Sequence, residues 1–173
     1  AFKNGNAVLR LIFINAIVFV LFITVKIVFT LFNVNATGFA EYLAVPASMQ
    51  MLLYKPWTLI TYMFYHEGFF HVFFNMFTLF WFGKIFLMYF SEKQLNALYF
   101  IGGFSGAFVF IFSYNIFPYF APVVPTSILL GASGSIMAII TAVAFRAPNM
   151  EMQMLFIGRV KLKWIAVFFI LTS

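Results

Sequence analysis

Three polar side chains in a strongly apolar chain have the types and spacing needed for acyl-transfer chemistry. Ser133 lies in the small-residue stretch GASG at 131–134, immediately before an apolar helical run. His71 and Asn75 are four residues apart, so on a helix they share one face. A hydroxyl at the start of a helix lies beside free backbone N–H groups that can stabilise an oxyanion. Spacing alone favours Ser133 as nucleophile and His71 as its general base.

Each motif also has a purely structural interpretation, which the sequence leaves open. The small residues at 131–134 are typical of a strip that lets two membrane helices pack closely. His71 and Asn75 could form an interhelical hydrogen bond and nothing more. We expect His66, just before the second apolar segment, to be an interfacial residue and not a ligand. Two histidines and no aspartate argue against a metal site, and the absence of cysteine excludes disulfides and thiolate catalysis.

The composition predicts a multi-pass membrane protein. Hydrophobic residues make up 65% of the 173 residues and charged residues 8%, and the mean hydropathy is +1.05. A soluble domain is about half apolar and about a quarter charged. We therefore expect an all-α polytopic membrane protein whose apolar segments form one helical bundle.

The apolar segments divide the chain into five expected spans. A helix needs about 20 apolar residues to cross a bilayer. Segments of suitable character occupy about 7–32, 69–90, 95–117, 129–145 and 163–173 and beyond. The fourth is short for a full crossing, and the fifth reaches the last residue, so we interpret the chain as a single domain, 1–173, truncated in span five.

Two connecting features refine this prediction. The connection at 33–68 is amphipathic, and Pro46, Pro56 and charged residues interrupt it. It should therefore form short helices that lie in the membrane interface and fold against the bundle. In the third span, Gly102 and Gly106 share one helix face, where a neighbouring helix can approach closely.

The distribution of Lys and Arg predicts the orientation. Eight of the ten basic residues fall on one side of the expected spans, one falls on the other side, and Lys26 lies within a span. The eight are Lys3, Arg10, Lys84, Lys93, Arg146, Arg159, Lys161 and Lys163. Basic loops face the cytoplasm, so the N-terminus should be cytoplasmic and the connection at 33–68 outside. The net charge of +6 is then a topology signal, not an indication of nucleic-acid binding.

This orientation places the three polar side chains at a similar depth. The second and fourth spans both run from outside to inside, so His71, Asn75 and Ser133 should all lie near the outer face. Polar groups within a membrane are costly and usually face the interior of the bundle. Irregular backbone before a short fourth helix is tolerated only beside protein or a water-filled cavity.

The paired motifs resemble those of a known family. HVFFNM at 71–76 in the second span and GASG at 131–134 opening the fourth are similar to the motifs of rhomboid intramembrane serine proteases. A long first loop, a glycine-rich third span and a short fourth span agree with that family. The resemblance covers essentially the whole chain, with about five of the six core spans that rhomboids share.

The resemblance implies a role for each site residue. Ser133 would be the nucleophile, and His71 and Asn75 would donate hydrogen bonds to the oxyanion together with the Ser133 backbone N–H. Phe74 would lie at the lateral gate for substrates, between the second and fifth spans. The general base would be a histidine on a sixth span, which replaces the role that spacing alone suggests for His71.

Two departures from the family pattern bear on activity. No histidine follows His71 in the sequence, so this fragment alone should be inactive. Met137 stands one turn after the serine, where relatives often carry a tyrosine that packs on the catalytic histidine.

The resemblance thus implies an endopeptidase that forms a Ser–His dyad and cleaves transmembrane substrates near the outer membrane boundary. It needs no cofactor, its partners are single-span membrane proteins and the lipid bilayer, and we place it in a bacterial inner membrane. Two alternatives remain. One is an inactive relative that binds membrane clients, and the other is an unrelated multispan protein whose glycines only pack helices.

Overall fold

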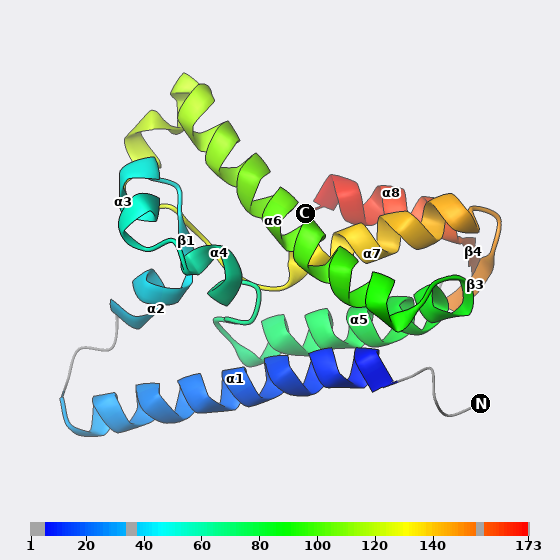
Figure 1. Cartoon of the computed structure of the whole chain (residues 1–173), viewed down its shortest axis with the longest axis horizontal. Coiled ribbons are helices and arrows are strands. Elements are labelled where there is room, and N and C mark those ends of the chain that lie inside the picture. Colours follow the sequence, from blue (N-terminus) through cyan, green and yellow to red (C-terminus); the bar gives the residue numbers. More distant parts are fainter. Residues whose placement is uncertain (1–5, 34–37, 155–157, 173) are drawn as a thin grey trace.

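The computed structural model describes residues 6–33, 38–154 and 158–172. It is mostly helical, with two small antiparallel strand pairs (Figure 1). Three helices are long and apolar enough to cross a membrane: α1 (Asn6–Leu31), α5 (Phe69–Tyr89) and α6 (Glu92–Ile116). Two shorter apolar helices follow them, α7 (Ser133–Arg146) and α8 (Leu162–Thr172).

Helices α5 and α6 form an antiparallel pair joined by a very short turn. Helix α5 ends at Tyr89, and the N–H of its C-cap residue, Phe90, still donates to the Phe86 carbonyl. Ser91 then caps α6 through a capping box, in which its hydroxyl accepts from the Gln94 N–H and the Gln94 side chain accepts from the Ser91 N–H. Because the stop and start signals are adjacent in sequence, the chain reverses direction without a loop.

The connection between α1 and α5 contains three short helices. These are α2 (Gly38–Leu43), α3 (Met49–Tyr54) and α4 (Thr58–Thr61). They lie on the same side of the molecule as the C-terminal half of α6, and α4 packs against α6 (Figure 1). Strand β1 (Val45–Pro46) interrupts them and pairs with β2 (Ile128–Leu129), the segment that leads into α7. The 3₁₀-helix η2 (Pro118–Val123) links α6 to β2.

Helix α7 lies at the centre of the bundle. It packs against α5, α6 and α8, while α1 covers the opposite side of α5 (Figure 1). Its 14 residues span about 21 Å, less than the roughly 30 Å hydrocarbon core. A helix this short must begin within the bundle, so the backbone before it needs partners inside the protein.

The link between α7 and α8 is a β-hairpin that the sequence analysis missed. Strand β3 (Glu151–Met154) pairs antiparallel with β4 (Gly158–Lys161). Met150, Met152 and Val160 pack against the core, while Arg159 and Lys161 are exposed. The sequence carries this alternation with a period of two, although its basic residues also follow the distribution that predicts topology.

Candidate active site

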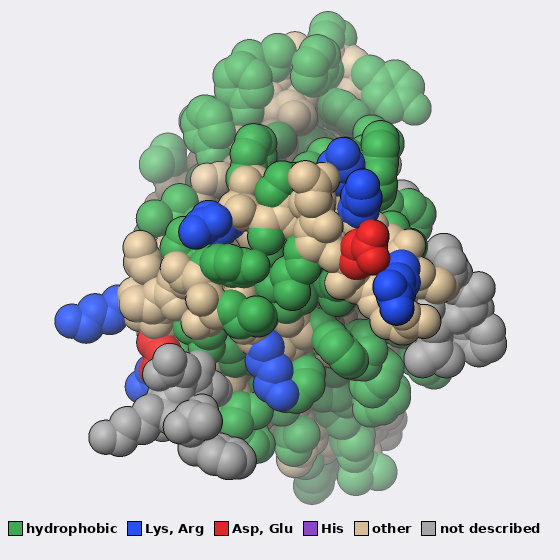
Figure 2. Space-filling model, turned by 90° about the vertical axis from the view of Figure 1, so that its right-hand side faces the viewer, with side chains coloured by type: hydrophobic (Ala, Val, Ile, Leu, Met, Phe, Trp, Pro, Cys, Tyr) green, Lys and Arg blue, Asp and Glu red, His purple; other side chains and the backbone are tan. Residues whose placement is uncertain are grey.

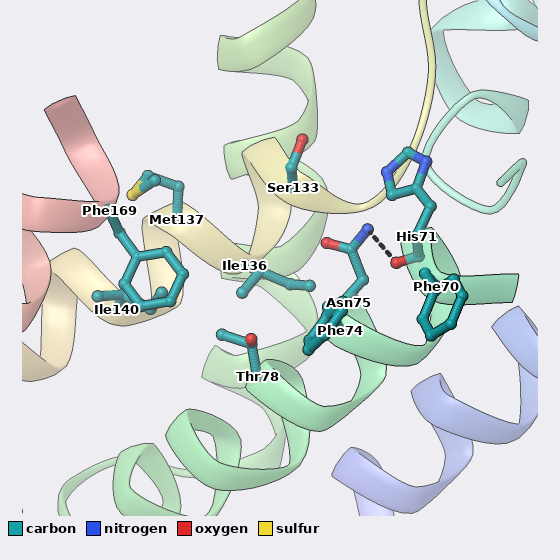
Figure 3. Close-up of a pocket in the computed structure, with 10 residues that line it drawn as sticks. All are labelled: Phe70, His71, Phe74, Asn75, Thr78, Ser133, Ile136, Met137, Ile140 and Phe169. Atoms are coloured by element: carbon teal, nitrogen blue, oxygen red, sulfur yellow. Dashed lines mark hydrogen bonds between the residues drawn. The ribbon is translucent and has the colours of Figure 1, made fainter. Parts of the chain in front are cut away.

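Ser133 lies at the first residue of α7 and lines a cavity of about 480 Å³ (Figure 3). Its side chain is exposed, whereas Ser135, two residues later, is buried. The N–H groups of the first turn of a helix have no partner within the helix. The Ser133 hydroxyl is therefore accessible from the cavity and lies beside the positive end of the helix dipole.

His71 and Asn75 line the same cavity from the first two turns of α5. Both are partly buried, and the Asn75 amide donates to the His71 carbonyl oxygen at 3.1 Å (Figure 3). A carboxamide has two N–H donors, so this bond orients the Asn75 side chain and leaves it a second N–H. The structure thus brings together the three residues that the sequence singled out.

Gly131 lets the backbone before α7 lie directly against His71. Its φ is +98°, a conformation that side chains other than glycine rarely adopt. A Cβ at this position would lie 2.6 Å from His71 Nε2, closer than any ordinary contact. Glycine is therefore required here both by the backbone conformation and by the imidazole that fills the adjacent space.

The segment before α5 holds the two residues that precede Ser133. The Tyr62 carbonyl accepts from the Gly131 N–H at 2.8 Å, and His66 Nε2 accepts from the Ala132 N–H at 3.4 Å. These bonds satisfy backbone donors that would otherwise be buried without partners. The next N–H, that of Ser133, belongs to the first turn of α7, whose N–H groups have no partner within the helix.

His66, which the sequence suggests as an interfacial residue, is a neutral imidazole buried within the protein. Its side chain is 2% exposed, and its ring packs edge-on against His71 with centroids 5.0 Å apart. Because Nε2 accepts a bond, Nδ1 carries the hydrogen and donates to the Phe64 carbonyl at 3.3 Å. Burial, with a smaller effect of His71, lowers the pKa of His66 to about 4.

The remaining walls of the cavity are mostly apolar. Phe70 and Phe74 come from α5 and stack with centroids 6.4 Å apart, and Phe169 comes from α8. Residues of α7 complete the lining, namely Ile136, Met137 and Ile140. Met137 therefore faces the same cavity as the serine (Figure 3).

Five lining residues were not among the sequence candidates, namely Phe70, Thr78, Ile136, Ile140 and Phe169. Thr78 lies one turn after Asn75 on the same face of α5, so the helical period could have identified it. No local signal could have identified Phe169, because its place depends on how α8 packs. Among the residues described, no group of three His, Asp or Glu side chains could hold a metal ion.

These features define a class of protein, a multi-pass helical membrane protein with a serine, a histidine and an asparagine around one cavity. The family model for the Rhomboid domain matches residues 54–173, which is most of the chain. The chain therefore belongs to the rhomboid family. This confirms the predicted family and the all-α polytopic fold, and it contradicts the alternative of an unrelated multispan protein. Comparisons with curated proteins and with solved structures return no match.

Proposed function

We propose that the full-length protein is an intramembrane serine endopeptidase. The observation that supports this proposal is the shared cavity of Ser133, His71 and Asn75 in a member of the rhomboid family. The exposed hydroxyl of Ser133 attacks the carbonyl carbon of a scissile peptide bond while a general base takes its proton. The C–N bond then breaks, and the proton passes to the amine that leaves. The resulting acyl-enzyme is then hydrolysed by water, which the open cavity admits.

His71 and Asn75 serve as oxyanion donors in this proposal. The Asn75 amide is already oriented by its bond to the His71 carbonyl, so little reorganisation is needed when negative charge develops. The His71 ring is held between Gly131 and His66. The Ser133 backbone N–H adds a third donor beside the nucleophile.

The general base is a histidine on a further span, by analogy with the family. Serine needs an adjacent base to be nucleophilic near neutral pH. Of the two histidines in this sequence, His66 accepts a backbone N–H and His71 is assigned to the oxyanion. We therefore expect the dyad to be completed by residues beyond Ser173 in the parent protein.

Substrates enter laterally between α5 and α8. Phe74 is 60% exposed on α5, and Phe169 of α8 lines the same cavity. A single-span membrane protein that unwinds near the outer boundary can then present its backbone to Ser133 without crossing the bundle. Phe74 acts as the gate on this route.

The orientation is part of the same proposal. Figure 2 shows Lys and Arg side chains gathered on the end of the molecule where α5 gives way to α6 and where the β3–β4 hairpin lies. Five basic residues belong to the elements at this end: Lys84 near the end of α5, Lys93 at the start of α6, Arg146 at the end of α7, and Arg159 and Lys161 in β4. We assign this end to the cytoplasm of a bacterial cell, and the end with α2–α4 to the outside.

Labelling of the full-length protein with a fluorophosphonate probe tests the assignment of the nucleophile. We expect labelling that Ser133→Ala abolishes and Ser135→Ala preserves, because Ser135 is a serine on the same helix that is buried away from the cavity. His71→Ala should slow labelling by roughly 10²-fold, the usual effect of losing an oxyanion donor. Labelling that survives Ser133→Ala overturns the proposal.

A second candidate is a rhomboid relative that binds membrane clients without cleaving them. The observation that favours it is Met137, which lines the cavity at the position where relatives often carry a tyrosine against the catalytic histidine. A well-folded full-length protein that takes up no probe supports this candidate. Its clients should then be recovered intact, and not as cleaved fragments.

A further inference from the structure

An apolar groove runs along α6 on the side that faces α3 and α4. Its cavity volume is about 420 Å³, and it is separate from the cavity that Ser133 lines. Helices α3 and α4 form one wall and α6 forms the other. The lining residues are Met49, Leu52, Leu59, Phe104, Phe108, Ile111, Phe112, Asn115 and Ile116.

The side chains that line the groove offer no free hydrogen-bond donor to a polar ligand. Asn115 is its one polar lining residue, and both amide N–H donors are used, one by the Ala47 carbonyl and one by the Ile111 carbonyl, each at 2.8 Å. The bond to Ala47 also ties α6 to strand β1 at this end of the groove. An occupant must therefore be held by apolar contact.

The length of the groove matches one leaflet of a bilayer. Its lining on α6 runs from Phe104 to Ile116, which is about 18 Å along a helix at 1.5 Å per residue. Half of the hydrocarbon core is about 15 Å. The groove is thus as long as an acyl chain that extends from the interface towards the bilayer centre.

The elements beside the groove are suited to the headgroup level. Trp57, at the start of α4, is 47% exposed and donates from its indole to the Tyr42 carbonyl at 2.8 Å. Lys55 lies over the Tyr42 ring, 4.5 Å from its centroid. Exposed Trp, Tyr and Lys side chains concentrate where a membrane meets water. A chain whose headgroup lies at this level can enter the groove directly.

We propose that the groove is a binding site for one acyl chain of a membrane phospholipid. The chain fills the space between α3, α4 and α6 and so completes the packing of the short helices against the bundle. This inference is independent of the proposed catalysis, because it involves neither Ser133 nor the cavity around it.

A membrane-spanning helix fits this groove less well than an acyl chain does. Helices associate in membranes through small residues that let their backbones approach. The exposed wall of the groove instead carries Phe104, Phe108 and Phe112. These rings hold a second helix at a distance, whereas a flexible chain can lie between them.

Photolabelling from a phospholipid with a diazirine in one acyl chain tests the site in nanodiscs. We expect label at Leu52, Leu59 and Ile111 to exceed label on the lipid-exposed face of α5 that carries Phe73 and Phe77. Equal label on the two faces would mean that lipid only covers the surface, and it overturns the proposal. This comparison uses the unmodified protein.

Two neighbouring leucines of α3 provide a matched pair of variants. Leu52 lines the groove, whereas Leu53 does not line it and is 82% exposed. Leu52→Trp should fill the groove and reduce label on α6 to the level of the α5 face, and Leu53→Trp should leave it unchanged. Indistinguishable labelling of the two variants argues against the site.

The nature of the occupant is tested separately with benzoylphenylalanine in place of Phe108. We expect its photoadduct to contain phospholipid. An adduct with a second copy of the chain, or with another membrane protein, assigns the groove to a helix and overturns the proposal.

Discussion

Gly131 joins the backbone before α7 to the imidazole of His71. Its positive φ and the 2.6 Å between a Cβ and His71 Nε2 are two separate constraints on one residue. Gly158 shares only the first constraint, because its φ is +85° but a Cβ there would meet nothing within 4 Å. Comparing substitutions at Gly131 and Gly158 therefore distinguishes the cost of backbone strain from the cost of a steric conflict with His71.

We predict that Gly131→Ala destabilises the protein more than Gly158→Ala does. Both variants should lose about 1–2 kcal/mol from the left-handed backbone, and Gly131→Ala should lose a further 1–3 kcal/mol or so from overpacking against His71. Thermal unfolding in detergent measures both losses. In a His71→Ala background the excess should disappear, and an excess that persists there refutes this explanation.

His66 gives the site a dependence on pH. Its imidazole is neutral in the folded protein because burial lowers the pKa from 6.5 to about 4. Between these values the unfolded chain binds a proton that the folded protein does not, so stability falls as pH decreases from about 6.5 to about 4. Below about pH 4 both the folded and the unfolded protein carry this proton, so His66 causes no further fall in stability.

We predict that His66→Gln removes this part of the pH dependence. The full difference corresponds to roughly 3 kcal/mol, and Gln retains an acceptor for the Ala132 N–H. The check is to measure thermal unfolding of both proteins from pH 4 to pH 7. All other titratable groups are common to both proteins, so parallel curves would show that His66 is not the responsible group.

At the scale of elements, the contact between α6 and α7 positions the nucleophile. A Cβ at Gly102 would lie 2.5 Å from Ala138 Cβ and 3.0 Å from the Gly134 carbonyl oxygen. A side chain at this position would therefore fit only if the backbone of α7 moved away from α6. At Gly106 the nearest atom, Gly134 Cα, would be 3.5 Å away, which is an ordinary contact. The sequence predicted close approach at both glycines, but only Gly102 is sterically required.

We predict that the two alanine variants differ in stability. Gly102→Ala should cost about 1–3 kcal/mol because α6 and α7 must separate. Gly106→Ala should change stability little, since ordinary contacts remain and alanine favours a helix by about 1 kcal/mol over glycine. Unfolding in detergent compares them, and similar losses at both positions would contradict the role of Gly102.

At the scale of the whole molecule, residues 62–63 connect α1 and α6 to the segment before Ser133. Asn15 of α1 donates to the Tyr99 hydroxyl at 3.2 Å, and Tyr99 donates to the Met63 carbonyl at 3.2 Å. The neighbouring Tyr62 donates to the Gly103 carbonyl and accepts from the Gly131 N–H. Packing of α1 and α6 is thereby linked, through residues 62–63, to the backbone before Ser133.

The distribution of basic residues and the length of α7 are also properties of the whole molecule. The basic ends of the elements gather at one end of the molecule, and α2–α4 lie at the other (Figures 1 and 2). This arrangement agrees with the orientation that the sequence predicted, which remains a proposal. The short α7 then begins within the bundle, so its cavity lies deeper below the end with α2–α4 than the start of a full-length span would.

The sequence by itself determined the class of membrane protein, its apolar segments and its family. These features depend on local properties, namely hydrophobicity over about 20 residues, helical spacing and two short motifs. His71, Asn75 and Ser133 could therefore be identified from residue types and spacing alone. The period of two at 150–154 was also readable, and it was missed because the nearby charges had another explanation.

Only the tertiary structure decided how those residues meet. The bonds from Gly131 to Tyr62 and from Ala132 to His66 join positions that are 69 and 66 residues apart, so no spacing rule predicts them. The same holds for Phe169 in the cavity, for the groove between α3 and α6, and for the burial of His66. Each depends on which faces of separate helices pack together, and hydrophobic contact is not directional enough for a sequence pattern to specify that choice.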